Sequence, residues 1–332
     1  MERVQRALDA SGIVGEDQGP HGISYTSRDL LLYALGVGST TDLRYLYEGA
    51  PGFAAFPTFP LVLPYKGTSS DIVPFPGRTL FLIPRGLRDV VDPATDAILH
   101  YDQSIDILQP LDPGGGELES RSVVLGLYRR RGGVLLRTKT TLTDKSSGRT
   151  MAETTQGTFM RGLEILGDAG PPLPPRPPPP TGPPDVVVAV AIPAQQALLY
   201  RLSGDYNAIH ADPEAARAAG LEKPILHGLC SLGIAAVQVL RCFCPDDPSG
   251  LVSLYCRFSR VVFPGDTVEV KMWGDGTEMA ERNQQQAIRF EVCSPRLGGA
   301  VVVADGMAVL KRPRLGEGAA VGREFPRDRA KL

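Results

Sequence analysis

Two short stretches of sequence decide the fold. Leu31-Leu-Tyr-Ala-Leu35 and Leu198-Leu-Tyr-Arg-Leu202 share one apolar frame and lie 167 positions apart. Pro57 and Pro224 repeat at the same offset, and no gap separates the two matches. Self-similarity at a fixed offset indicates that one structural unit occurs more than once in the chain. We therefore predict a chain that contains two copies of one unit.

Each copy is followed by runs that are typical of β-strands, with partial apolar–polar alternation and many β-branched residues. These runs are residues 79–83, 98–108, 122–129, 134–142 and 150–160 in the first copy, and 251–258, 267–273, 286–292 and 300–310 in the second. Each copy also has one helix-sized apolar pattern before its strands, and in the second copy this pattern spans residues 228–243. A helix followed by long meandering strands suggests an antiparallel sheet wrapped around a helix, the hotdog arrangement. The duplication predicts an α+β double hotdog, with two such units packed side by side.

The clearest boundary is the stretch from Pro171 to Pro184, in which ten of fourteen residues are proline. Proline lacks an N–H and fixes φ, so this stretch predicts an extended spacer rather than a helix or a central strand. We accordingly divide the chain into a first hotdog (1–170), a proline-rich linker (171–184), a second hotdog (185–316) and a polar tail (317–332).

Composition excludes several classes of protein. A length of 332 residues corresponds to about two domains, and the formal net charge of −2 argues against a nucleic-acid binder. The longest apolar run, Val186–Ile192, is far shorter than the ~20 residues of a membrane span. The N-terminus carries no pattern of a secretory signal. Five cysteines without a Cys-x-x-Cys pair indicate buried free thiols in a reducing compartment.

The residues with chemical potential lie in the segment Tyr200–His210. Asp205 and His210 are five residues apart, which on a continuous helix separates them by about 140°. They can act together only on a loop, and Gly204 and Asn207 favour a loop there. A Gly-Asp-x-Asn segment alone is more often a turn with self-capping side chains, and that reading stays open.

A helix start follows this segment. Asp212 and Pro213 are typical of the first residues of a short helix, which Gly220 would end. The long helix then begins at Gly228, whose free N–H can stabilise negative charge on an oxygen. His227 precedes that helix, and we expect a structural role for it.

The comparison of the two copies favours a functional site over a simple turn. At the offset of 167, Asp205 corresponds to Gly38, His210 to Leu43 and Gly228 to Leu61. Both copies keep the apolar frame, but only the second carries the titratable set. A carboxylate, an imidazole and an N–H pocket together make a plausible active site.

These residues resemble a known family. Gly204-Asp205-x-Asn207-x-x-His210, followed by Pro224-Ile-Leu-His-Gly228, resembles the hydratase 2 motif of MaoC-like (R)-specific 2-enoyl-CoA hydratases. Tyr33-Ala-Leu-Gly-Val-Gly38 and further stretches of the first copy resemble the eukaryotic two-hotdog form. The chain departs from the pattern at Ala208, where the family usually has proline. It has no Gly-x-Gly-x-x-Gly, so the dehydrogenase domain often fused to this hydratase is not expected.

The resemblance implies reversible hydration of trans-2-enoyl-CoA to (3R)-3-hydroxyacyl-CoA in fatty-acid β-oxidation. Asp205 and His210 would hold one water and move its protons, and Asn207 would orient the loop or that water. The N–H of Gly228 would form the oxyanion hole. The first hotdog would be catalytically degenerate and would accommodate the acyl chain.

Candidate ligands of the CoA phosphates are Lys223, Arg257 and Arg260. We expect no cofactor beyond the CoA of the substrate, and no metal, because His21 and His100 lack partners at ligand spacing. The sequence leaves open whether two chains pair as a homodimer.

The C-terminal Ala330-Lys331-Leu332 resembles a peroxisomal address, which implies a peroxisomal location and an import receptor as a partner. Three alternatives remain at this stage: a hotdog acyl-CoA thioesterase, a non-catalytic acyl-CoA-binding module, and a dehydratase that acts on carrier-protein substrates.

Overall fold

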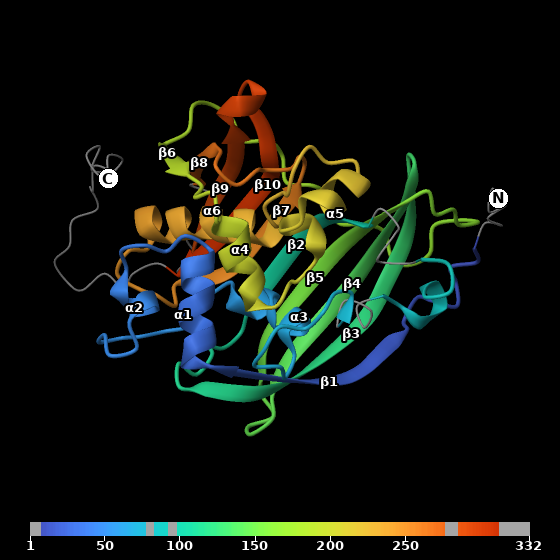
Figure 1. The fold of residues 1–332 in the computed structure, drawn as a ribbon, viewed down its shortest axis with the longest axis horizontal. Coiled ribbons are helices and arrows are strands. Elements are labelled where there is room, and N and C mark those ends of the chain that lie inside the picture. The colour runs from blue at the N-terminus through green and yellow to red at the C-terminus, as the bar shows by residue number, and fades with distance from the viewer. Residues whose placement is uncertain (1–7, 78–82, 92–97, 276–284, 312–332) are drawn as a thin grey trace.

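The computed structural model describes residues 8–77, 83–91, 98–275 and 285–311, and its strands form one antiparallel sheet (Figure 1). Ten strands lie in the order β1-β3-β4-β5-β2-β7-β10-β9-β8-β6. Those of the first half are β1 (Asp17–Thr26), β2 (Ile98–Ile107), β3 (Gly115–Arg130), β4 (Gly133–Asp144) and β5 (Thr150–Arg161). Those of the second half are β6 (Val186–Ala191), β7 (Leu251–Phe258), β8 (Thr267–Asp275), β9 (Gln285–Ser294) and β10 (Ala300–Lys311).

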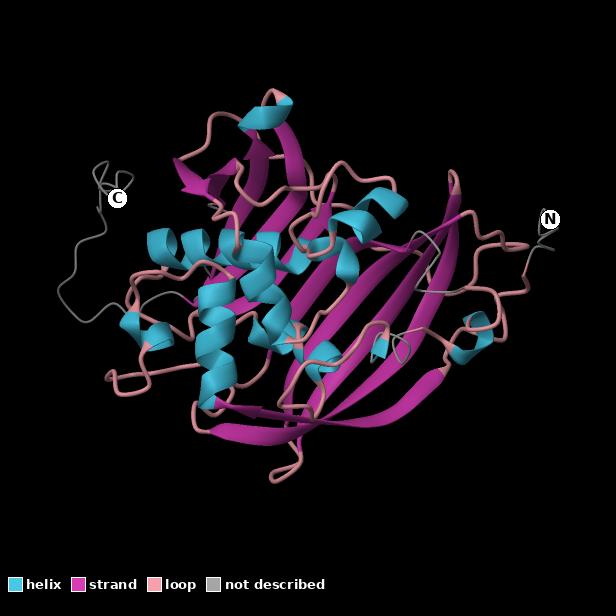
Figure 2. Cartoon of the chain, viewed as in Figure 1, coloured by secondary structure: helices cyan, strands magenta, loops and turns pink. Residues whose placement is uncertain are grey.

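The prediction of an α+β double hotdog is confirmed, with the two expected sheets joined into one. Strands β2 and β7 pair antiparallel where the halves meet, and Ser104 lies opposite Tyr255 in this register. Figure 2 shows the helices gathered on one side of the curved sheet. No helix among the described residues is long and apolar enough to span a membrane.

The long helix of the second half is α6 (Gly228–Phe243), at the predicted position. Most of its side chains are buried, because it packs against β7, β8, β9 and β10. The first half has only short helical segments at the equivalent place, the 3-10 helix Phe59–Leu61 and α3 (Leu63–Lys66). Pro64 lies in the first turn of α3, where a missing N–H is tolerated, and α3 ends at Gly67, which has a φ of 61°.

The two repeated motifs pack against each other in the core. The first lies on α1 (Ser27–Gly36), and the second lies on α4 (Gln196–Tyr200) and the 3-10 helix that follows it; α1 and α4 run side by side. The rings of Tyr33 and Tyr200 are fully buried, with centroids 5.9 Å apart. Gly36 lies so close to Tyr200 that a Cβ on this glycine would be 3.3 Å from the Cα of the tyrosine. The repeat therefore forms one of the contacts between the halves, in addition to the pairing of β2 with β7.

The predicted runs from 98–108 onward each fall on a strand of the structure, although 122–129 covers only the second half of β3 and β6 was not among them. Strand β1 was not expected, because Gly19 and Pro20 obscure its alternation; the structure accommodates them at a register shift between Asp17 and Pro20. Residues 79–82 of the predicted strand 79–83 lie outside the described residues, and Ile83 lies in a bend. The remaining helices are α2 (Leu43–Leu46) and α5 (Pro213–Ala218).

The proline-rich stretch 171–184 contains no helix and no strand, and donors of the sheet hold its carbonyl groups. The hydroxyl of Tyr128 donates to the carbonyl of Pro171 (2.6 Å), and the indole N–H of Trp273 donates to that of Gly182 (3.2 Å). Arg289 donates to the carbonyl of Pro178. The linker is thus fastened to both halves, and the domain boundaries given above stay predictions.

Candidate active site

The loop that carries Asp205 and His210 is held in place by a glycine. Gly204 ends the 3-10 helix Arg201–Ser203 with φ of 133°, which is accessible only to glycine without strain. A Cβ on Gly204 would lie 2.7 Å from the backbone N of Lys66, at the end of α3. The loop is therefore seated directly on the first half of the chain.

Two side chains of the loop fold its backbone. A carboxylate oxygen of Asp205 accepts the N–H of Asn207 (3.2 Å), and the amide oxygen of Asn207 accepts the N–H of Ile209 (3.2 Å). The second bond caps the 3-10 helix Ala208–His210, which carries the histidine. Of the two roles expected for Asn207, the structure shows the orientation of the loop.

The imidazole of His210 is buried and points one nitrogen at the backbone. Its Nδ1–H donates to the carbonyl of Ile225 (2.9 Å), so Nε2 keeps a free lone pair. Burial lowers the pKa of His210, and the neighbouring charge of Asp205 opposes that shift. The ring is therefore a neutral base near pH 7.

Asp205, His210 and His227 form a compact group. One carboxylate oxygen of Asp205 and one ring nitrogen from each histidine lie within 4.8 Å of one another. Two groups at this separation can both hydrogen-bond one water at normal distances of about 2.8 Å. The structure thus brings Asp205 and His210 together as the sequence predicted.

The same three residues match the ligand types of a metal site, but their rings are badly arranged for one. The imidazoles of His210 and His227 stack, with centroids 3.6 Å apart and 23° between their planes. A metal ion binds in the plane of each ligating ring, at about 2.1 Å from the nitrogen. Two stacked rings cannot both meet that condition, so the geometry favours a water rather than a metal ion.

The start of α6 supplies the N–H groups of the site. Gly228 is the first residue of this helix, and the N-cap His227 makes no side-chain capping bond. The first N–H groups of the helix are consequently free for a ligand, and the helix dipole favours negative charge there. Gly228 lies against the ring of Phe258, where a Cβ would be 3.3 Å from two ring carbons.

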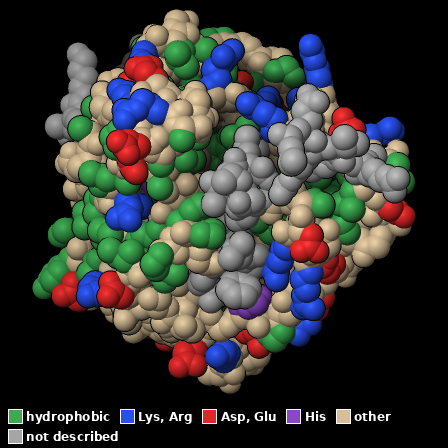
Figure 3. Space-filling view, turned by 45° about the vertical axis from the view of Figure 1, so that its right-hand side comes forward, with side chains coloured by type: hydrophobic (Ala, Val, Ile, Leu, Met, Phe, Trp, Pro, Cys, Tyr) green, Lys and Arg blue, Asp and Glu red, His purple; other side chains and the backbone are tan. Residues whose placement is uncertain are grey.

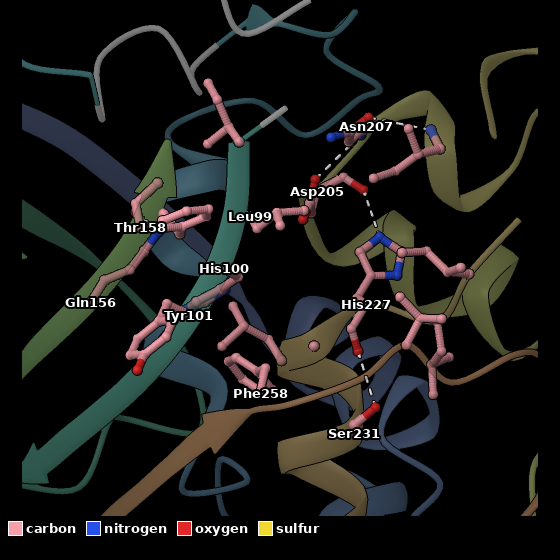
Figure 4. Close-up of a pocket in the computed structure, with 18 of the residues that line it drawn as sticks. Leu99, His100, Tyr101, Gln156, Thr158, Asp205, Asn207, His227, Ser231 and Phe258 are labelled. Carbon is pink, nitrogen blue, oxygen red and sulfur yellow. Dashed lines mark hydrogen bonds between the residues drawn. The ribbon is translucent and has the colours of Figure 1, made fainter. Parts of the chain in front are cut away.

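These groups open into a cavity of about 510 Å³ that both halves line (Figure 4). Figure 4 shows Leu99 and Thr158, from strands β2 and β5, facing Asp205 and Asn207 across it. Further apolar side chains of the first half, such as Leu136 and Met160, extend its lining. The second half thus supplies the polar chemistry and the first half much of the apolar wall.

Arginines also line this cavity. They are Arg260, one of the three predicted phosphate ligands, and Arg130 and Arg131 at the β3–β4 turn. Figure 3 shows Lys and Arg side chains gathered on the upper part of a face that is hollowed beside them.

The other two predicted phosphate ligands do not line the cavity. The Nζ of Lys223 lies 5.1 Å from the ring centroid of Phe263, and Arg257 pairs with Asp305 at 2.7 Å.

Sequence reasoning missed several cavity residues. Nε2 of His100 shares a hydrogen bond with the amide oxygen of Gln103 (3.1 Å), and the ring packs edge-on against Phe258. Burial lowers the pKa of His100 to about 4. His227 was expected to be structural, yet it lines the cavity beside His210. The arginine run 129–131 was a visible signal for the cationic turn. Leu99-His100 and Arg257-Phe258 lie in stretches that also resemble the family, but their place in the cavity was not predicted.

A second, smaller cavity occupies the corresponding place in the other half. Its volume is about 220 Å³, and its lining includes Phe56 and Pro57, which correspond to Lys223 and Pro224 at the offset of 167. It lies between the end of β2 and the start of β7, just as the first cavity lies between the end of β7 and the start of β2. Its described lining holds no Asp, Glu or His. The described lining of this first-half cavity therefore carries no acid–base pair, and Gly38 and Thr40, the counterparts of Asp205 and Asn207, line a different cavity.

Comparison with known proteins supports the assignment of both halves of the chain. The model of the MFE-2 hydratase 2 N-terminal domain matches residues 23–162, and that of the MaoC like domain matches residues 177–293.

Among curated proteins, the chain is 32% identical to a probable enoyl-CoA hydratase 2 of Dictyostelium discoideum, covering 92% of this chain and 97% of that protein. It is 33% identical to the mouse peroxisomal multifunctional enzyme type 2, covering 81% of this chain but only 35% of that longer protein.

Among solved structures, a MaoC-like dehydratase from Phytophthora capsici matches with a TM-score of 0.82 and 37% identity. The match covers 92% of this chain and 98% of that chain.

Proposed function

The chain belongs to the MaoC-like hydratase 2 family, and we propose from its site that it adds water reversibly to trans-2-enoyl-CoA, giving (3R)-3-hydroxyacyl-CoA in fatty-acid β-oxidation. It is a hydro-lyase. The observation that carries the proposal is that a carboxylate oxygen of Asp205 and a ring nitrogen of His210 lie within 4.8 Å of each other, close enough to bind one water, beside the start of α6.

The substrate is electrophilic at C3, because its double bond is conjugated with the thioester carbonyl. As the oxygen of the bound water bonds to C3, Nε2 of His210 takes one of its protons. The carboxylate of Asp205 orients the water and stabilises the imidazolium that forms. The proton then returns from the Asp205–His210 pair to C2, so that one water is consumed. Positioned acid–base groups of this kind typically contribute about 10²–10⁴-fold.

Negative charge develops on the thioester oxygen during the attack at C3. The N–H of Gly228, at the positive end of α6, is placed to donate to this oxygen. One such donor is worth about 3–4 kcal/mol in comparable sites. The ring of Phe258 fills the space behind Gly228 and keeps the peptide in place.

The two ends of the substrate bind to different parts of the cavity. The acyl chain lies along the apolar wall that the first half supplies, which includes Leu136 and Met160. The CoA phosphates bind Arg130, Arg131 and Arg260, since arginines recognise phosphate oxygens in paired hydrogen bonds.

We further propose that the protein is imported into peroxisomes by the receptor that binds Ala330-Lys331-Leu332, a segment outside the described residues. The peroxisomal name of the mouse relative supports this. In a fluorescent fusion, deletion of Leu332 should move the protein from punctate structures to the cytosol. Unchanged punctate staining would contradict the proposal.

The reaction is tested with trans-2-decenoyl-CoA, by following the loss of enoyl absorbance and resolving the chirality of the product. Wild type should form the (3R) product, and Asp205→Ala should not. Release of free CoA thiol would indicate a thioesterase instead. Binding without any reaction in both proteins would indicate a non-catalytic acyl-CoA module, and a strong preference for carrier-protein substrates would indicate the related dehydratase.

A further inference from the structure

His227 contacts the catalytic loop and the ring of His210 and precedes the start of α6, yet it has no assigned role in the reaction. Its side chain is 2% exposed, and it precedes Gly228 at the start of α6. Its Nε2–H donates to the backbone carbonyl of Asp205 (3.2 Å), as the dashed line in Figure 4 shows. One face of its ring stacks on His210, and Tyr200 lies 4.8 Å away between ring centroids.

Packing alone does not explain a histidine at this position. Its Nδ1 is buried and makes no hydrogen bond. An unsatisfied buried acceptor destabilises a fold, and an apolar ring of the same shape would avoid that cost. What an apolar ring would lack is the Nε2–H donor, and that donor binds the loop of Asp205.

The imidazole of His227 must also be uncharged to remain buried against His210. Burial, and after it the neighbouring His210, lower the pKa of His227 well below its ordinary value. With Nδ1 bare and Nε2 protonated, the ring presents its donor to Asp205 and its flat face to His210. The single side chain thereby fixes the distance between the catalytic loop, the base and the helix start.

We propose that His227 is a positioning residue of the hydration reaction, which holds the backbone of Asp205, the ring of His210 and the N-terminus of α6 in one arrangement. This inference rests on the proposed hydratase function. It assigns no contact with substrate to His227. Because misplacement of reacting groups by about 1 Å lowers rates by as much as ~10²-fold, loss of the Nε2–H donor should lower kcat strongly.

Two substitutions separate positioning from packing. His227→Phe keeps the stacked ring and loses the donor, whereas His227→Gln keeps an N–H donor and loses the ring. We expect kcat of the Phe variant to fall by about 10- to 100-fold, with KM changed less than about two-fold, and the Gln variant to keep more of its kcat. The Phe variant should nevertheless unfold at the higher temperature, because it preserves the packing and removes the bare acceptor.

His227→Phe is thus expected to be the more stable variant and the slower enzyme, and His227→Gln the less stable variant and the faster enzyme. If kcat follows the unfolding temperature, so that Phe is the better enzyme, the inference is overturned while the hydratase function stands. If wild type itself fails to hydrate enoyl-CoA, the proposed function is overturned first.

A second measurement does not depend on variants. The protein has four histidines, so ¹⁵N labelling of histidine gives a simple spectrum in which His227→Gln identifies one set of signals. We expect a neutral His227 with its proton on Nε2 from pH 6.5 to pH 8. A proton on Nδ1, or a charged ring in that range, would contradict the inference.

Discussion

Substitution of Gly204 by alanine tests how the catalytic loop is held. The φ of 133° at Gly204 is a strained conformation for any residue with a Cβ, at a cost of about 1–3 kcal/mol. The added Cβ would also lie 2.7 Å from the N and 2.8 Å from the Cα of Lys66, which are backbone atoms and cannot rotate away. Lys66 itself is anchored, since its Nζ donates to the carbonyls of Ser24 (2.8 Å) and Ser69 (2.9 Å).

The loop must therefore move rather than α3, and it carries Asp205 with it. We expect Gly204→Ala to lose about 2–4 kcal/mol of stability and to lower kcat by roughly 10²-fold, with a small effect on KM. Steady-state kinetics with trans-2-decenoyl-CoA and thermal unfolding measure the two effects separately.

The matched control is Gly220→Ala. Gly220 also has a positive φ (77°), but a Cβ there would meet nothing within 4 Å, and it lies beyond the catalytic loop. Gly220→Ala should lower the free energy of unfolding by about 1–2 kcal/mol and leave kcat unchanged. The reasoning is refuted if Gly204→Ala keeps wild-type kcat, or if both variants lose activity equally.

Three further predictions follow from the site. Because burial lowers the pKa of His210 below 6.5 in the protein without substrate, the acid limb of kcat/KM should lie below pH 6.5; an acid limb at or above 6.5 would contradict this. Burial also lowers the pKa values of His100 and His227 in the folded protein, so the unfolded chain binds more protons than the folded one below pH 6.5. Denaturant titrations should therefore show that the free energy of unfolding falls as the pH drops below 6.5, and that this contribution is fully present above pH 6.5. Arg131→Glu should raise KM for enoyl-CoA at least about ten-fold with little change in kcat, and the increase in KM should be smaller at high salt. The control Arg257→Gln, outside the cavity, should leave KM unchanged.

Local patterns were sufficient to predict much of this molecule. The repeat around Tyr33 and Tyr200 predicted two related halves, and helical spacing located α6. Asp205, Asn207 and His210 lie within six consecutive residues, so their grouping needed no knowledge of the tertiary structure. Gly228 was found because helix starts have a recognisable pattern of their own.

What the sequence did not predict arises from contacts between distant segments. Pairing of β2 with β7 brings His100 next to Phe258, and nothing local to either residue records that pairing. The direction of a side chain is equally invisible in a sequence, so the place of His227 in the cavity, beside His210, could not be predicted. Arg257 was chosen for its charge, but its cross-strand partner Asp305 already neutralises it.

The central claim is that Asp205 and His210 act as a pair on one water. Its most direct test is kcat for enoyl hydration in Asp205→Asn, in His210→Gln and in the double variant. Groups that work as one unit are non-additive, so each single variant should lose nearly as much activity as the double variant, about 10³-fold or more. Losses that multiply in the double variant would show that the two residues act independently and would contradict the account.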